Sequence, residues 1–269
     1  MGNGFYGQTI CWENDSESEK DMSYGVPAVR LLIKIIYTDN SIKKIYSDKS
    51  WKASTGPIVF DNVYGGDTYD ARYEIQGWCT TCFNDNGWDK VKVITPEITK
   101  LSSQEMPPIK KLLKLKPKRI FKSPVTGKWI VDFGRNIAGW VKITVNEKEG
   151  QVIKIRTTEA LTKDGKDIFP GSTGGYDNGM KQLLEYICRG DGSEIWEPKF
   201  SYHGFRYAEI SGLSIKPDIN TISAILVAAD VKQTGHFSCS DSLLNKMDTI
   251  SRWTVEDNLH GIPEDCPQR

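Results

Sequence analysis

The stretch VPAVRLLIKIIYTDNSIKKI, residues 26–45, has two runs rich in β-branched side chains on either side of the polar cluster 38–41. Such a pattern is typical of a β-hairpin. Further short apolar runs, separated by glycine and Asn-Gly turns, follow at 51, 58–60, 69–75 and 91–94. This spacing favours a sandwich of strands over alternating strands and helices. We therefore expect the first part of the chain to be all-β.

Two adjacent prolines, Pro107 and Pro108, interrupt both helix and central strand and mark a boundary. A second set of apolar runs predicts strands at 129–133, 140–145, 152–158, 182–188, 206–210 and 224–227. The expected fold is mainly β, with two jelly-roll-like β-sandwich modules over residues 1–106 and 107–230.

The hydrophobic period changes after Ser240, where Leu243, Leu244, Met247 and Ile250 follow helical spacing. We predict one amphipathic helix over 241–258, with Ser240 as its N-cap. Residues 231–269 then form a third unit, a linker helix with a polar segment after it.

Composition excludes several classes of partner. Lys plus Arg equals Asp plus Glu at 35 each, which argues against nucleic acid and anionic membranes as partners. No apolar run approaches the roughly 18 residues of a membrane helix, and residues 1–7 lack a signal-peptide pattern. Cys79 and Cys82 have zinc-site spacing, but a second ligand pair is missing, so a structural role is expected.

Residues 61–72, DNVYGGDTYDAR, form an oxygen-rich loop around a Gly-Gly turn. Such a loop can bind calcium or the hydroxyl groups of a sugar through Asp61 and Asn62. The alternative is an ordinary polar loop with a surface pair between Asp70 and Arg72. Composition alone favours that alternative.

For the other residues that could bind a sugar or catalyse a reaction, we expect a structural role. Tryptophans in a sandwich are more often core residues than sugar platforms, and we expect His203 to pack rather than to catalyse. Glu264 and Asp265 are neighbouring carboxylates, whereas glycoside hydrolysis needs two carboxyl groups about 5–10 Å apart across the scissile bond. This segment is therefore a solvated tail or part of a site that other residues complete.

Six stretches, in this order, resemble the α-L-rhamnosidases of glycoside hydrolase family 78. They are GNGFYG at 2–7, YGGDTYDAR at 64–72, VDFGRNIAGWV at 131–141, WEPKFSYHGFRY at 196–207, GHFSCSD at 235–241 and IPEDCPQR at 262–269.

The resemblance implies β-sandwiches followed by an (α/α)6 catalytic barrel, of which residues 231–269 are the start. It also implies inverting hydrolysis by two glutamates of the barrel, the general acid falling two residues beyond Arg269. Asp265 matches an aspartate that binds rhamnose hydroxyls, and Asp61-Asn62 resembles a pair in a calcium-dependent rhamnose site. The GNG motif normally follows several strands, so front strands are expected to be missing.

Three hypotheses follow. The chain is the non-catalytic N-terminal portion of an α-L-rhamnosidase and is inactive alone, or a calcium-dependent carbohydrate-binding module, or purely a scaffold. The expected substrates are glycosides and oligosaccharides that contain L-rhamnose, and no cofactor is required unless calcium is bound. Unpaired strand edges would associate with the barrel or with another copy of the chain.

Overall fold

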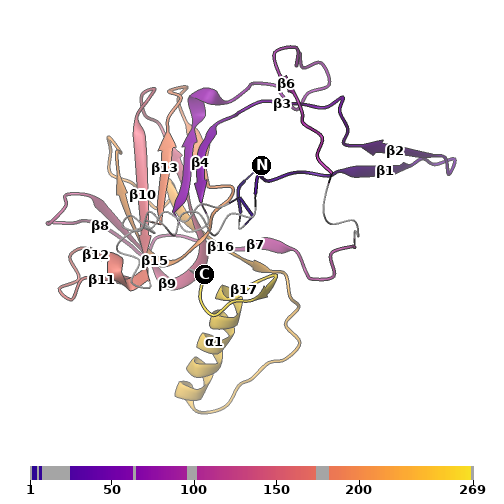
Figure 1. Ribbon diagram of the computed structural model, residues 1–269. Coiled ribbons are helices and arrows are strands. Elements are labelled where there is room, and N and C mark those ends of the chain that lie inside the picture. Colours follow the sequence, from indigo (N-terminus) through magenta and orange to yellow (C-terminus); the bar gives the residue numbers. More distant parts are fainter. Residues whose placement is uncertain are drawn as a thin grey trace.

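The computed structural model describes residues 2–4, 6–7, 25–62, 65–95, 102–173 and 182–267. These residues form a mainly β structure with one α-helix, as predicted (Figure 1). The strands are β1 (Leu32–Ile36), β2 (Ile42–Tyr46), β3 (Lys52–Ala53), β4 (Ile58–Asn62), β5 (Gly66–Asp70), β6 (Asp89–Lys90), β7 (Ile109–Leu115), β8 (Arg119–Lys122), β9 (Trp129–Val145), β10 (Val152–Thr158), β11 (Ala160–Leu161), β12 (Ile168–Phe169), β13 (Leu183–Ile187), β14 (Glu194–Trp196), β15 (His203–Ser211), β16 (Ile222–Ala229), β17 (Leu259–His260) and β18 (Ile262–Pro263). The helices are η2 (Ala71–Tyr73), η3 (Pro170–Thr173) and α1 (Ser242–Asp257).

A ten-stranded sheet forms the body of the molecule, with the order β4-β5-β13-β10-β15-β9-β16-β7 and with β8 and β14 paired to β9. The long strand β9 joins two parts of this sheet. Its first half pairs with β8 and β15, and its second half with β16 and β14. We predicted two strands here, at 129–133 and 140–145, but they form the one strand β9, which has an irregular pairing with β15 around Gly134 (φ +87°).

Gly139 lets β9 approach β16 closely, because a Cβ atom there would lie 1.8 Å from the carbonyl oxygen of Ile225. The core lies between the two parts of the sheet. Its largest fully buried side chains include Phe133 and Phe205, whose rings meet edge to face at 5.8 Å. Burial of each such side chain contributes about 1.5–3 kcal/mol. Every residue of β16 is buried, as expected for a central strand.

The strands before Pro107 are arranged in two ways. The predicted hairpin is confirmed as β1 and β2, which form a separate two-stranded sheet that extends away from the body (Figure 1). In contrast, β5 pairs in parallel with β13, so β4 and β5 extend the large sheet. Among the described residues before Pro107, Ala71 is the one apolar side chain in the buried core.

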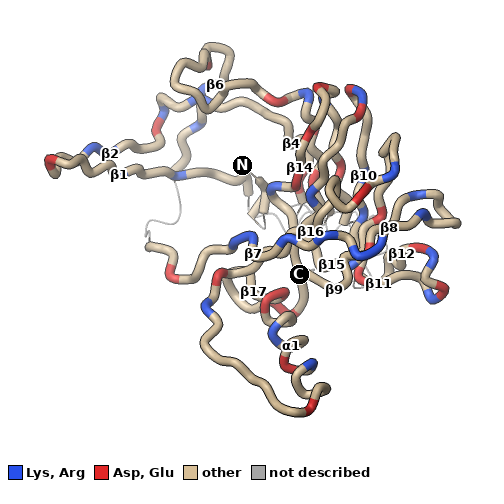
Figure 2. Tube along the Cα trace, turned by 180° about the vertical axis from the view of Figure 1, so that it is seen from behind, with Lys and Arg blue, Asp and Glu red and all other residues tan. Residues whose placement is uncertain are grey.

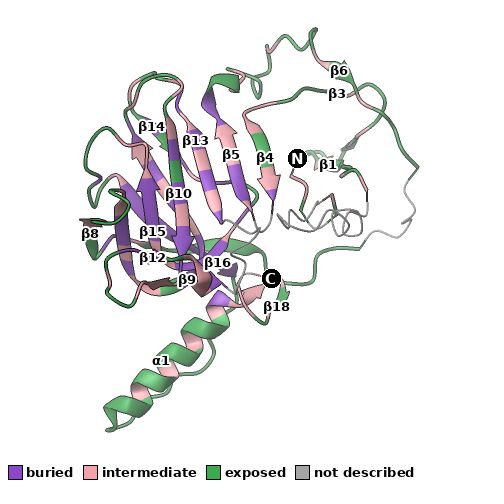
Figure 3. Cartoon of the chain, turned by 60° about the vertical axis from the view of Figure 1, so that its left-hand side comes forward, coloured by how far each residue is buried: buried purple, intermediate pink, exposed green. Residues whose placement is uncertain are grey.

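The helix α1 begins one residue later than predicted. Asp241, not Ser240, is the N-cap, because its Oδ1 accepts the backbone N–H groups of Leu243 (2.7 Å) and Leu244 (3.3 Å). Much of α1 is exposed (Figure 3). Its apolar residues Leu243, Leu244, Met247 and Ile250 are each more than 45% exposed. No helix of the described residues is long and apolar enough to cross a membrane.

Candidate functional site

Asp67 joins the two halves of the chain. It is 2% exposed on β5, and its Oδ2 accepts the backbone N–H groups of Lys199 (2.8 Å) and Phe200 (3.1 Å). Burial raises the pKa of this carboxyl group, and the two N–H donors oppose that effect. Because Asp67 and Lys199 belong to two of the stretches that carried the family resemblance, one function of these motifs is to connect strands distant in sequence.

Asp61 and Asn62, the predicted calcium and sugar ligands, lie at the end of β4. Asp61 Oδ2 accepts the backbone N–H of Asn3 at 2.7 Å, and its Oδ1 accepts Nδ2–H of Asn3 at 3.2 Å. Asn62 is buried, and its Oδ1 accepts the N–H of Gly65 at 2.7 Å. Within the described ranges, no group of three His, Cys, Asp or Glu side chains could hold a metal ion. The calcium and sugar site therefore stays a prediction.

Asp70 and Arg72 form the pair predicted for an ordinary loop. The guanidinium group of Arg72 donates to both carboxylate oxygens of Asp70, at 2.9 and 2.6 Å, and lowers the pKa of that group. Asp70 is nevertheless buried and also caps η2, so the pair is not confined to the surface.

Trp196 packs in the core, as predicted for tryptophans, whereas Trp78 is 60% and Trp253 38% exposed. Trp196 is 4% exposed, and its ring stacks on Tyr186 at 5.3 Å. Tyr186 donates to Glu194 at 2.8 Å, and burial followed by this hydrogen bond raises the pKa of the phenol. A sugar cannot stack on the rings of Trp196 and Tyr186, because other core side chains cover them.

His203 has the packing environment that we expected. It is 2% exposed, its Nδ1 lies 3.0 Å from Oγ1 of Thr157, and Thr157 donates to Gln182 at 3.3 Å. Burial lowers the pKa of His203 to about 3, so the ring is neutral near pH 7.

Asp265, the predicted rhamnose ligand, follows β18 and is exposed. The residue before it, Glu264, lies in a polar cluster that the sequence analysis did not identify. Tyr202 donates its hydroxyl to Glu264 Oε1 at 2.7 Å, and His260 Nδ1 lies 3.1 Å from Glu264 Oε2. The sequence feature that could have indicated this cluster is the four-residue spacing of His260 and Glu264, with Gly261 between them.

A second polar contact ties the end of α1 to β9. Asp257 is buried, and its Oδ1 accepts the backbone N–H of Ala138 at 3.1 Å. Arg135 Nη2 lies 3.8 Å from the same oxygen, and its guanidinium group lies 4.1 Å from the ring centre of Trp253. Burial raises the pKa of Asp257 to about 6 despite the N–H donor and the nearby cation.

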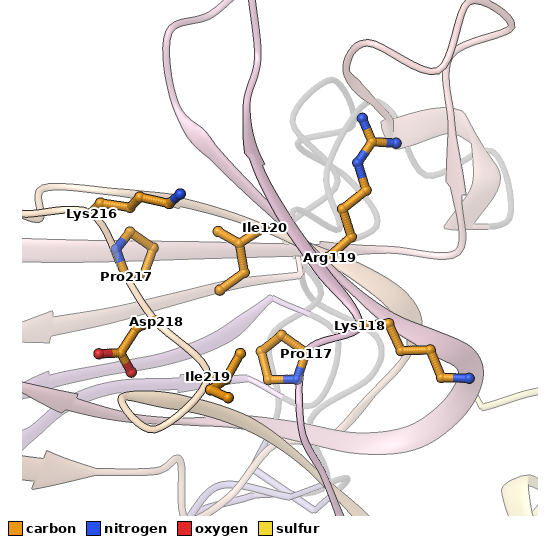
Figure 4. A pocket seen from close by; sticks show the side chains of 8 residues that line it. All are labelled: Pro117, Lys118, Arg119, Ile120, Lys216, Pro217, Asp218 and Ile219. Atoms are coloured by element: carbon orange, nitrogen blue, oxygen red, sulfur yellow. The ribbon is translucent and has the colours of Figure 1, made fainter.

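A shallow cavity of about 300 Å³ lies between β8 and the loop before β16 (Figure 4). Its lining residues are Pro117, Lys118, Arg119, Ile120, Lys216, Pro217, Asp218 and Ile219. Asp218, the one carboxylate of this lining, already accepts the N–H groups of Asn220 and Thr221. The cavity therefore lacks the two carboxyl groups of a hydrolytic site. Figure 2 shows both basic and acidic residues scattered along the chain trace.

Three family profiles match consecutive parts of the chain. The α-L-rhamnosidase N-terminal domain matches residues 1–112, and the bacterial α-L-rhamnosidase concanavalin-like domain matches residues 122–228. The bacterial α-L-rhamnosidase six-hairpin glycosidase domain matches residues 232–269.

Relatives and solved structures agree with these profiles. An α-L-rhamnosidase of Formosa agariphila is 60% identical over the whole chain, which spans 28% of that protein. The solved structure of a Streptomyces avermitilis α-L-rhamnosidase, complexed with L-rhamnose, has a TM-score of 0.88 at 26% identity. The match covers 99% of this chain and 25% of the Streptomyces chain.

The structure of an α-L-rhamnosidase from Dictyoglumus thermophilum has a TM-score of 0.82 at 38% identity, over 89% of this chain and 26% of its own. The chain thus spans less than a third of the length of these relatives. The three domain profiles, the related sequence and the solved structures all belong to α-L-rhamnosidases. The chain therefore belongs to the α-L-rhamnosidases of glycoside hydrolase family 78 and corresponds to their N-terminal portion.

Proposed function

We propose that this chain is the non-catalytic N-terminal scaffold of an enzyme that hydrolyses terminal α-L-rhamnosides with inversion. One observation carries the proposal: Asp265, which matches the rhamnose-binding aspartate of the family, directly follows a residue that is hydrogen-bonded to the sandwich. The scaffold would thereby bring a substrate ligand to a defined place at the end of α1.

The chemistry of inversion explains why we assign no acid or base to the described residues. An inverting hydrolase needs a general acid and a general base about 6.5–9.5 Å apart, with room for a water molecule. Glu264, the carboxylate next to Asp265, already has Tyr202 and His260 at hydrogen-bonding distance. We assign both catalytic groups to residues of the glycosidase domain other than 232–269, the range that its profile matches here.

The exposed apolar face of α1 supports a partner for this scaffold. Leu243, Leu244, Met247 and Ile250 form a stripe that would bury well against other helices. We propose that the catalytic barrel covers this stripe, and another copy of the chain is the alternative. The substrates would be rhamnose-containing glycosides, without nucleic acid or a membrane as partner.

The test is hydrolysis of p-nitrophenyl α-L-rhamnopyranoside by this chain and by a form extended to the length of its relatives. We expect no turnover from the chain alone, and turnover with inverted product from the extended form, followed by NMR. Turnover by the chain alone, or an inactive extended form, would contradict the proposal.

The alternative of a calcium-dependent rhamnose site needs its own test. Titration of L-rhamnose into this chain, with calcium and then with chelator, should give saturable calcium-dependent heat if Asp61 and Asn62 bind the sugar. That heat should disappear in Asp61→Ala. No heat under either condition would leave the scaffold as the role of the first 106 residues.

A further inference from the structure

His260 is enclosed by three groups from different parts of the fold. Its side chain is 2% exposed, and its ring stacks on that of Tyr202, with ring centres 4.3 Å apart and an angle of 22°. Its Nε2 lies 2.8 Å from the carbonyl oxygen of Val227 on β16, and its Nδ1 lies 3.1 Å from Oε2 of Glu264.

These contacts determine how many protons the cluster holds. A carbonyl oxygen only accepts, so Nε2 of His260 must carry a hydrogen that it donates to Val227. The Tyr202 hydroxyl donates to Oε1 of Glu264. The remaining contact, between Nδ1 and Oε2, requires one further proton, because a neutral Nε2–H ring and an ionised carboxylate would place two acceptors face to face.

We propose that His260 and Glu264 share this proton and act as a clamp, positioning residues that fix Asp265 relative to the sandwich. The inference rests on the proposed function, since Asp265 matters only if it binds the substrate. Val227 belongs to a fully buried strand, and Tyr202 immediately precedes β15, so the clamp is anchored on the rigid body of the fold.

The local backbone supports the same conclusion. β17 and β18 form a minimal hairpin around Gly261, whose φ of +102° favours glycine. Glu264 donates its N–H to the carbonyl of Asn258 at 2.8 Å, which closes this hairpin against the end of α1. Asp265 therefore leaves the hairpin from a point that both backbone and side-chain hydrogen bonds define.

The proton count is tested by ¹⁵N NMR of the histidine rings in this chain near neutral pH. We expect two N–H signals for His260 in the wild type. In Glu264→Gln, the amide can accept from Tyr202 and donate to Nδ1, so we expect a single Nε2–H on a neutral ring and an intact clamp. The proposal that the two residues share a proton would be overturned by two results together: a single His260 N–H signal in the wild type, and a ¹³C NMR shift that shows the Glu264 carboxyl group to be ionised.

The clamp itself is tested by amide hydrogen exchange in residues 258–267. Loss of one or two hydrogen bonds should speed exchange about tenfold or more in Glu264→Ala and His260→Phe, and less in Tyr202→Phe. Glu264→Gln should retain wild-type protection. The matched control is His236→Phe, which replaces an exposed histidine. Unchanged exchange in both Glu264→Ala and Tyr202→Phe would overturn the clamp.

The extended protein supplies the functional test. Glu264→Ala should lower kcat/KM for the aryl rhamnoside about tenfold or more, and Glu264→Gln should restore most of the loss. Equal loss in both variants, or no loss in Glu264→Ala, would overturn the positioning role. If the extended wild type is inactive, the proposed function fails, and the exchange data still decide whether the clamp exists.

Discussion

Asp67 and Lys199 are 132 residues apart in the chain, and Oδ2 of Asp67 accepts the backbone N–H of Lys199 at 2.8 Å. The same oxygen accepts the N–H of Phe200, so one buried carboxylate satisfies two backbone donors of another segment. Hydrogen bonds to a charged group contribute about 1.5–3 kcal/mol each, which makes this contact a strong connection between the two halves.

The first prediction concerns this carboxylate. Asp67→Ala should lower the free energy of unfolding by about 2–4 kcal/mol, because two backbone N–H groups lose a charged acceptor at a partly buried site. Asp67→Asn should cost less, since its amide oxygen can still accept. Urea unfolding measures both. Asp191→Ala, at an exposed ion pair, is the control and should cost at most about 1 kcal/mol. An Ala variant as stable as wild type would contradict this account.

Gly66 allows β5 to lie beside β13. A Cβ atom there would lie 2.0 Å from the carbonyl oxygen of Leu183, and φ is +108°. We predict that Gly66→Ala lowers the free energy of unfolding by about 3 kcal/mol or more, because backbone must move. In Gly56→Ala no atom lies within 4 Å of the new Cβ, so thermal melting should change little. Similar melting of the two variants would refute the close approach.

Asp257 should make the fold less stable as pH rises. Its pKa is raised from 3.8 to about 6 by burial, so the folded state binds the proton more tightly than the unfolded state. The stability that the protonated Asp257 contributes is complete below about pH 4 and is lost as pH rises through about 6. The difference is about 3 kcal/mol. Urea unfolding of wild type and Asp257→Asn across this range should show the wild type losing stability relative to the variant. Asp248→Asn is the control, and parallel curves for wild type and Asp257→Asn would count against the raised pKa.

His203 should act in the opposite direction. Its pKa is lowered from 6.5 to about 3 by burial, so the unfolded state binds a proton that the folded state excludes. The stability that the neutral His203 ring contributes is therefore complete above about pH 6.5 and is lost as pH falls toward 3. The same unfolding experiment should show a weaker acid loss in His203→Gln than in wild type. His236→Gln, at an exposed histidine, should follow the wild type, and an identical acid loss in all three would contradict the prediction.

Local patterns were sufficient for several elements. The hairpin of β1 and β2 was predicted from two β-branched runs around a turn, and α1 from helical spacing, with an error of one residue at its N-cap. The resemblance to α-L-rhamnosidases was also available from motifs alone. These features depend on side chains within a few residues of one another, so the linear sequence records them directly.

Other features depend on which strands meet. Two predicted strands proved to be the single strand β9, whose second half pairs with β16 at a close approach that Gly139 permits. The parallel pairing of β5 with β13, and the Asp67 contact beside it, joins segments that no local pattern connects.

By itself the sequence determined the family, the β-rich class, the helix and the candidate ligand Asp265. The tertiary structure alone decided that Tyr202, Val227 and Glu264 all contact one another or the ring of His260. Tyr202 lies 62 residues from Glu264 along the chain. The physical reason is that hydrogen-bond partners are chosen by the packing of strands, and packing is a property of the folded chain rather than of any segment.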